Sequence, residues 1–193
     1  MKSEYTKCHR DDGSVEREIW HLNNKYHRTD GPAVIDYRED GSVRIKRWFL
    51  NDKFYRINGP ATVYYNKDGN IDREIWYLND KYHRVYGPAY ICYREDGNIE
   101  IECWHLNGEY HRADGPAFIR YRNDGSVERE GWYLNDEYID PEEHLTPTPK
   151  TEEEKIELIN KFVFIEEGND YVFIKEWLKR DKKFYDKYRI LVE

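Results

Sequence analysis

A histidine, an arginine and an acidic residue recur together in this chain, and these residue types can do chemistry. In the segment HRTDG, His27 and Arg28 precede Asp30, and a histidine returns at His83 and at His111. An imidazole close to a carboxylate can act as a general base, and several imidazoles can hold a metal ion. The spacing of the histidines decides whether either chemistry is expected.

Catalysis is disfavoured because the group repeats. A catalytic constellation is needed once, whereas these residues return every 28 positions. In the copy that begins at Phe54, Tyr55 takes the histidine position and Asn58 takes the position of Asp30. Tyr86 takes the position of Asp30 in the following copy. We therefore interpret the histidine or tyrosine as a brace for a turn. The arginine that follows it is predicted to pair with nearby carboxylates, and no catalytic residue is predicted.

A shared metal site is also disfavoured. Equivalent positions in adjacent hairpins would lie two strands apart, about 9–10 Å, whereas zinc needs its ligand atoms about 2 Å away. Three cysteines, Cys8, Cys92 and Cys103, lack metal-binding spacing, which predicts unpaired thiols in a reducing compartment. The chain contains no phosphate-binding glycine loop, H-E-x-x-H or G-x-S-x-G motif. We predict no metal, no cofactor and no enzymatic activity.

The segments that must position these residues repeat with the same period of 28 residues. The repeat runs from about Glu4 to Tyr138, as a half unit, four full units and a fading end. Leucine and asparagine return two and three positions after each tryptophan. The recurring tryptophans are Trp20, Trp48, Trp76, Trp104 and Trp132.

Each unit is predicted to form two strands joined by a hairpin turn. In the second unit the first strand is Ala33–Tyr37 and the second runs from Ser42 to Leu50. An Asp-Gly pair lies between them, and glycine accepts the positive φ of such a turn without steric cost. The turn glycines expected at positive φ are Gly41, Gly69, Gly97 and Gly125.

The second strand carries a conflict of phase. Val43 and Ile45 share one parity, but Trp48 and Leu50 have the other. A regular strand cannot direct all four side chains to one face. Either a bulge lies between the two pairs or the two ends of the strand are buried against opposite sides. We also expect Trp76 and Trp104, in central units, to be more buried than Trp20.

These repeated residues carry a resemblance to a known family. The segments NDKYHRVYGPA and NGEYHRADGPA, each followed by a strand and Asp-Gly, resemble a MORN-like repeat. This variant is frequent in proteins of large DNA viruses and phages, and the resemblance covers about residues 5–138. It implies a ribbon of β-hairpins that serves as a scaffold and often self-associates. It implies no catalytic residues.

The predicted fold is therefore mainly β, an elongated antiparallel β-hairpin array over residues 1–140 with a C-terminal α-helical segment. Three prolines mark residues 141–150 as a linker. A capping box, Thr151 with Glu154, and an apolar stripe at helical spacing predict helices within residues 151–193. Those helices either cap the last hairpin or form a docking or dimerising pair.

Composition limits the partners. The net charge is −8, which disfavours general binding to nucleic acid or to anionic membranes. No apolar run approaches the roughly 18 residues of a membrane helix, and the start MKSEYTKCHRDDG has no signal-peptide core. The expected location is cytoplasmic.

The expected function is a non-enzymatic scaffold or protein-binding module that forms homo-oligomers. A viral origin is expected, with the protein in the host cytoplasm or packaged in the virion. Peripheral lipid binding is an alternative, and so is an acidic decoy for a basic host protein; an enzyme is the least favoured. The stripe of strand carboxylates that motivates the decoy is Glu16, Glu18, Glu74, Glu100, Glu102, Glu128 and Glu130. Cross-strand ion pairing explains the same carboxylates more simply.

Overall fold

The computed structural model describes residues 4–56 and 58–141. This part is almost entirely strand and turn, so the prediction of a mainly β chain of antiparallel hairpins is confirmed. All the described strands belong to one compact unit, Met1–Ile139. The predicted helical segment, 151–193, and the predicted linker beyond Pro141 lie outside the described residues.

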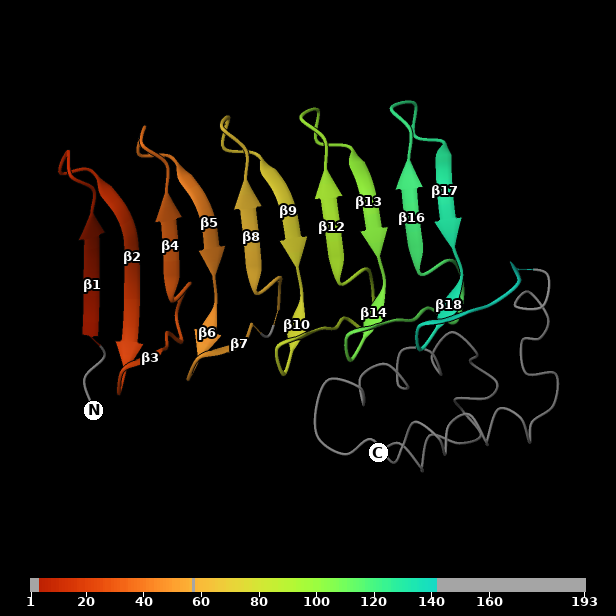
Figure 1. Cartoon of the computed structure of the whole chain (residues 1–193), viewed down its shortest axis with the longest axis horizontal. Helices are drawn as coiled ribbons and strands as arrows, with labels where there is room; N and C mark the ends of the chain where they lie inside the picture. Colours follow the sequence, from red (N-terminus) through yellow and green to blue (C-terminus); the bar gives the residue numbers. More distant parts are fainter. Residues whose placement is uncertain (1–3, 57, 142–193) are drawn as a thin grey trace, which may run out of the picture. The chain divides into compact units, whose positions relative to one another are not determined.

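The long strands form one antiparallel meander (Figure 1). Each hairpin pairs with the next, so the sheet order follows the chain: β1-β2-β4-β5-β8-β9-β12-β13-β16-β17. The first strands of the hairpins are β1 (Glu4–His9), β4 (Val34–Tyr37), β8 (Thr62–Tyr65), β12 (Tyr90–Tyr93) and β16 (Phe118–Tyr121). The second strands are β2 (Val15–Leu22), β5 (Val43–Arg47), β9 (Ile71–Ile75), β13 (Ile99–Cys103) and β17 (Val127–Gly131).

The turns of these long hairpins follow one design. In the β4–β5 turn, the Gly41 N–H bonds the Arg38 carbonyl at 3.1 Å, and the Arg38 N–H bonds the Ser42 carbonyl at 2.8 Å. The φ angles of Gly41, Gly69, Gly97 and Gly125 are 81°, 83°, 84° and 82°. These angles confirm the expectation of positive φ at all four glycines. Each turn is followed by a β-bulge, between residues 43 and 45 in this hairpin.

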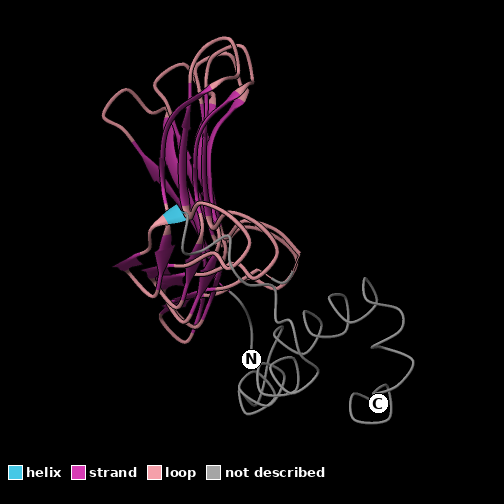
Figure 2. Ribbon diagram, turned by 90° about the vertical axis from the view of Figure 1, so that its right-hand side faces the viewer, coloured by secondary structure: helices cyan, strands magenta, loops and turns pink. Residues whose placement is uncertain are grey.

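Short hairpins return the chain from one unit to the next, and their strands are turned out of line with the long ones (Figure 2). Two consecutive residues at each tip have positive φ, such as Asn51 at 53° and Asp52 at 68°. This is the pattern of a type I′ turn, which asparagine and aspartate tolerate better than other side chains. The short strands are β3 (Lys25–Tyr26), which pairs with β2, and four pairs: β6 (Phe49–Leu50) with β7 (Lys53–Phe54), β10 (Tyr77–Leu78) with β11 (Lys81–Tyr82), β14 (His105–Leu106) with β15 (Glu109–Tyr110), and β18 (Tyr133–Leu134) with β19 (Glu137–Tyr138).

The phase conflict of the second strand is resolved at the tryptophan. Trp48 lies between β5 and β6, where its N–H bonds the Ala61 carbonyl of the next hairpin at 2.8 Å. Ile45 and Phe49 have the same parity and are buried, whereas Trp48 points to the other face. The two ends of the second strand are therefore buried on opposite faces of the sheet. The bulge lies before Ile45 instead of beside Trp48.

The short hairpins are held together by a continuous row of aromatic rings. Each ring lies 4.2–5.9 Å from the next, measured between centroids. In order, the rings belong to His21, Tyr26, Phe49, Phe54, Tyr77, Tyr82, His105, Tyr110, Tyr133 and Tyr138. Because each unit contributes two rings, neighbouring units contact each other through this row.

His105 is the polar member of this row whose replacement should stabilise the protein. It is 6% exposed, and its Nδ1 has no hydrogen-bond partner within the described residues. Burial lowers the pKa of His105, an effect that the nearby backbone of Cys103 offsets only in part. As the pH falls below about 6.5, the unfolded chain therefore takes up a proton that the folded chain resists, and stability falls.

We expect His105→Phe, which installs the residue type of Phe49, to raise the free energy of unfolding by about 1 kcal/mol at neutral pH. The gain should grow between about pH 6.5 and 5, because the substitution removes the titrating imidazole. Urea denaturation of both proteins across this pH range measures the effect. A constant difference from neutral to acidic pH would contradict the assignment.

Arginines tie the tips of the long hairpins to each other. The Arg10 guanidinium donates to the Val15 carbonyl at 2.9 Å and to the Tyr37 carbonyl of the next hairpin at 2.5 Å. Arg38 and Arg94 reach the following hairpin in the same way. Asn66 holds the equivalent position between them, and its side chain caps its own turn instead.

The five tryptophans of the repeat are all half-buried, and the expected difference in burial between central units and Trp20 stays a prediction. Trp20 also has a neighbour on its outer side, because β1 pairs with β2. The Tyr5 ring lies 4.9 Å from the Trp20 ring, between centroids.

Candidate interaction surface

The two faces of the long sheet differ in how strictly they repeat. The repeating face carries the tryptophans, the aliphatic residues Ile35, Val63, Ile91 and Ile119, and a tyrosine from each first strand after β1. The variable face carries a row of side chains that follows the sheet order: Arg17, Asp36, Ile45, Tyr64, Arg73, Cys92, Ile101, Arg120 and Arg129.

On the repeating face, an arginine lies over each of the first four tryptophan rings. The Arg84 Cζ is 3.9 Å from the centroid of the Trp76 ring, and the Arg84 guanidinium also donates to the Pro88 carbonyl at 3.2 Å. Burial lowers the pKa of Arg84, yet a guanidinium stays charged at neutral pH.

The carboxylates predicted as partners of these arginines are present in two units. Arg28 pairs with Asp30 and Arg112 pairs with Asp114, whereas Tyr86 stands at the corresponding position beside Arg84. The partner that all four arginines share is therefore the indole ring, which the sequence did not indicate.

This stacking explains the glycine of the Gly-Pro-Ala motif. A Cβ atom placed on Gly115 would lie 2.9 Å from the Arg112 Cζ. The backbone of Gly115 has no positive φ, so the requirement for glycine here is one of space. The guanidinium is held between the indole ring on one side and the glycine backbone on the other.

We expect Gly115→Ala to lower the free energy of unfolding by about 1–2 kcal/mol, because the methyl group displaces the arginine from the ring. In an Arg112→Ala background the same substitution should be nearly neutral, since the space is then empty. Thermal denaturation of the two single variants and the double variant decides this. Equal losses in both backgrounds would show that the guanidinium is not the group displaced.

The histidines brace turns, as predicted, but the turns belong to the next unit. His27 Nδ1 lies 3.0 Å from the Asn51 Oδ1 atom, and His111 Nδ1 lies 2.8 Å from the Asn135 Oδ1 atom. Each contact joins residues 24 positions apart. The imidazoles therefore hold the type I′ turns in place and do not converge.

Tyrosine–glutamate hydrogen bonds link neighbouring hairpins on the same face. The Tyr37 hydroxyl donates to the Glu18 carboxylate at 3.0 Å, and the Tyr121 hydroxyl donates to Glu102 at 3.0 Å. Burial, together with this hydrogen bond, raises the pKa of Tyr37 and of Tyr121 to about 12. The carboxylates of the predicted acidic stripe are in these cases engaged inside the array.

The variable face contains a buried carboxylate, Asp36, which is 2% exposed. Arg17 of β2 donates through Nε to Asp36 Oδ1, and Arg47 of β5 donates to Oδ2 at 2.6 Å. The Asp36 hydrogen bond raises the pKa of Arg17. One carboxylate thus joins the strands on both of its sides.

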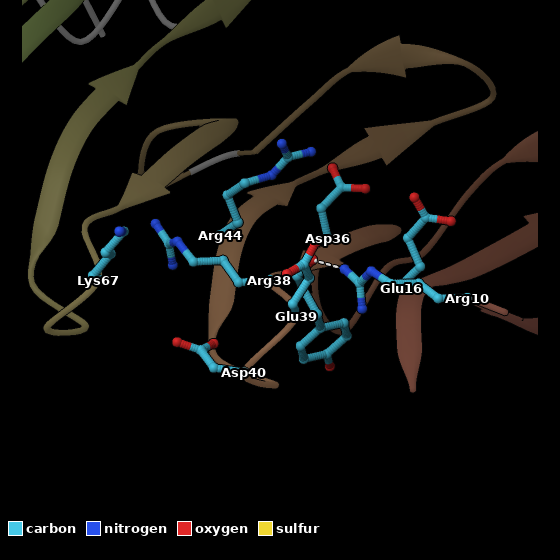
Figure 3. A pocket seen from close by; sticks show the side chains of 9 residues that line it. Arg10, Glu16, Asp36, Arg38, Glu39, Asp40, Arg44 and Lys67 are labelled. Carbon is cyan, nitrogen blue, oxygen red and sulfur yellow. Dashed lines mark hydrogen bonds between the residues drawn. The ribbon is translucent and has the colours of Figure 1, made fainter. Parts of the chain in front are cut away.

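A shallow depression opens next to Asp36, near the tips of the first hairpins. Its rim is formed by charges of both signs, with the Arg10 and Arg44 side chains around the carboxylates of Asp36 and Glu39 (Figure 3). Lys67 reaches it from the β8–β9 turn. The depression is open and polar, with neighbouring groups of opposite charge.

A second depression occupies the equivalent place between the last two long hairpins. There Arg120 pairs with Glu100 at 3.0 Å and with Glu128 at 3.2 Å. Arg120 holds the position of Asp36, so the sign of the central charge is reversed between the two ends of the sheet. The Arg120 side chain is 49% exposed and available to a partner.

The cysteines of the variable face are free thiols without activation. Cys92 and Cys103 face the same side of the β12–β13 hairpin, opposite Ile101 and Tyr90. Burial raises the pKa of the Cys103 thiol to about 11 and also raises that of Cys92. A raised pKa leaves both as thiols, which are poor nucleophiles at neutral pH.

Within residues 4–56 and 58–141, no group of three or more His, Cys, Asp or Glu side chains is placed to hold a metal ion. Nor does this part of the chain contain a helix that is long and apolar enough to cross a bilayer.

Comparison with known proteins adds little. No protein-family model matches the sequence, and no curated protein matches it. Among solved structures, one similar chain belongs to a crystal structure of a GtfA/B complex bound to UDP and GlcNAc. The identity is 15%, the TM-score is 0.25, and the match covers 66% of this chain and 23% of that one. A similarity at this level carries no argument about fold or function.

The variable row was not predicted from the sequence. Arg17, Asp36 and Tyr64 lie at positions of the repeat that change residue type from unit to unit, whereas a repeat is recognised by the positions that stay the same. The signal available in the sequence was the change of residue type, from unit to unit, at the repeat positions that face one side of the sheet.

Proposed function

We propose that this protein is a non-enzymatic, MORN-like repeat scaffold that binds protein partners and associates with itself. The observation that carries the proposal is the division between the two faces. The residue types of one face repeat from unit to unit, while the row on the other face changes, and this row is exposed at Arg120 and Arg129. Because the units differ on this face, a partner can bind at one defined unit. An exact repeat would offer the same site at every unit.

The charge pairing of the variable face supports a binding role in preference to a catalytic one. Asp36 is held by two arginines and Arg120 by two glutamates. Complementarity to a partner comes from charges that stay accessible at the surface, and the Arg120 side chain is 49% exposed. A viral origin and a location in the host cytoplasm or the virion belong to the same proposal, and they rest on the family resemblance.

Three measurements test the proposal. Light scattering at tens of micromolar should show self-association, and co-sedimentation at physiological salt should show no binding to phosphoinositide vesicles or duplex DNA. A strict monomer would remove the self-association. Salt-sensitive vesicle binding would favour a peripheral lipid-binding protein instead.

Partner binding can be tested on the variable face itself. A partner recovered from host cells should be lost with the double substitution Arg73→Glu and Arg120→Glu, because both side chains lie in the variable row. The matched control is Glu95→Lys, which also changes charge but at an exposed hairpin tip. Loss of the partner with the control alone would place the binding site at the tips.

A further inference from the structure

The described sheet ends in two strands that have a neighbour on one side only. β1 pairs with β2, and β17 pairs with β16. Most residues of both strands are exposed. Such edges present rows of backbone donors and acceptors that can pair with another strand.

We propose that β17 of one molecule pairs with β1 of a second copy, in the register that already joins neighbouring units. The array would then continue from molecule to molecule. This inference rests on the proposed self-association and names the surface that would produce it.

The register follows from the translation by one repeat period. Between units, Arg17 faces Asp36 and Glu18 faces Ile35. One period earlier in the chain, Asp36 and Ile35 correspond to Cys8 and Lys7, and the β1–β2 hairpin pairs in the same way as β4–β5.

The same translation places the residues of the last strand. In β17 the counterparts of Arg17 and Glu18 are Arg129 and Glu130. Arg129 would therefore face Cys8 of the next molecule, and Glu130 would face Lys7.

The charges at this junction are complementary. The column that holds Lys7 in β1 holds an aliphatic residue in the later units: Ile35, Val63, Ile91 and Ile119. Lys7 Nζ lies 3.3 Å from a Glu18 carboxylate oxygen within its own hairpin. In the proposed junction, Glu130 would approach Lys7 from the other side. A lysine on an edge strand opposes indiscriminate pairing, whereas a strand that brings a glutamate opposite to it is favoured.

An arginine of the last long hairpin is also positioned to bond to a neighbouring molecule. Arg10, Arg38 and Arg94 each use one guanidinium nitrogen on their own hairpin and another on a carbonyl of the next hairpin. Arg122 makes the first contact, to the Val127 carbonyl at 2.6 Å. Its second contact would fall on the His9 carbonyl of the next copy, the counterpart of the Tyr37 carbonyl that Arg10 reaches.

The backbone of β17 is turned in the required direction. The Trp20 N–H bonds the Ala33 carbonyl across to β4, so the even-numbered residues of β2 direct their backbone groups to the following hairpin. Glu130 is the counterpart of Glu18, and its N–H and carbonyl therefore point to the open edge. An interface between two different edges adds copies in one direction, so it gives an open chain or a ring of molecules and not a closed dimer.

Cross-linking tests the register directly. Arg129→Cys would place a thiol opposite the native Cys8 of the next copy, at a position without direct backbone hydrogen bonds, where Cα atoms lie about 4.5 Å apart and a disulfide can form. Mild oxidation should give a ladder of covalent dimers, trimers and longer species on a non-reducing gel. The ladder should disappear with Arg129→Cys combined with Cys8→Ser, and it should be strongly reduced with Glu130→Cys, which points to the opposite face.

A second variant tests the backbone. Glu130→Pro removes an outward N–H without breaking a bond to β16, so the monomer should keep its melting temperature within a few degrees while self-association is lost. Glu130→Ala keeps the N–H and should weaken association by no more than about fivefold, the value of one exposed ion pair. Equal effects of the two substitutions would overturn the proposed backbone pairing.

The outcomes separate the two proposals. Oligomers in light scattering without a Cys8-dependent ladder would overturn the β17–β1 register and leave the self-associating scaffold in place. A monomer at tens of micromolar would overturn both. A ladder that stops at a covalent dimer would contradict the addition of copies in one direction.

Discussion

Replacing Trp76 with alanine will lower the free energy of unfolding by about 3 kcal/mol, the lower end of the range for a large aromatic residue because the ring is half-buried. The substitution removes the surface against which Arg84 is stacked at 3.9 Å. It also leaves Arg84 confined between a cavity and the Gly87 backbone. Urea denaturation followed by circular dichroism measures the loss.

A double-mutant cycle separates the ring from the guanidinium. Trp76→Ala, Arg84→Ala and the combined variant should show a coupling of about 1 kcal/mol, as for a cation held over an indole face. Additive losses would mean that the ring stabilises the array through burial alone. An unchanged melting temperature for Trp76→Ala would contradict the role of the tryptophan altogether.

Replacing Asp36 with alanine will lower the free energy of unfolding by about 2–3 kcal/mol. Breaking a buried ion pair costs about 3–5 kcal/mol when the remaining charge stays buried. Here the Arg17 and Arg47 side chains are 40% and 25% exposed, so water can solvate them in part and the cost is lower. Chemical denaturation measures the change. A loss no larger than that of an ordinary surface substitution would show that the arginines need no carboxylate.

The repeat supplies a matched control for this prediction. Ile45 holds the position of Arg17 in the next unit, and Ile75 holds the position of Arg47. The triple variant Arg17→Ile, Asp36→Val and Arg47→Ile should be close to the wild-type stability, because apolar groups of similar size can replace a buried ionic cluster. If the triple variant is as unstable as Asp36→Ala, packing and not charge is responsible for the loss.

Hairpins, turns and strand order were predictable because each depends on local chemistry. Gly41 and Asp40 define a turn by themselves, and the return of the same turn once in every unit leaves a meander as the simplest arrangement. The tryptophan positions could be recognised from the sequence, but the face of the sheet on which they lie could not be predicted. Its conflict of phase with Ile45 is removed by an interruption of the strand at Trp48, which depends on a backbone bond to Ala61 in another hairpin.

The contacts that sequence reasoning missed are those between units. Arg84 was expected to seek a carboxylate, since its charge is the feature that a sequence displays. Arg84 lies over the Trp76 ring because the loop that follows β11 folds back across the end of β9. The row from Arg17 to Arg129 escaped notice for a related reason: its members do not share one residue type, and only strand register brings them together.

The third long hairpin has Asn66 at the position that is arginine in the other hairpins, and this difference has a mechanical consequence. Arginine cross-ties stiffen the joints between the first, second and third long hairpins and between the fourth and fifth, while the joint between β8–β9 and β12–β13 has no such tie from Asn66. Under bending or stretching, an elastic ribbon yields where its bending stiffness is lowest. The hairpin tips should therefore splay first at this joint, which divides the ribbon into a stiff segment of three hairpins and one of two.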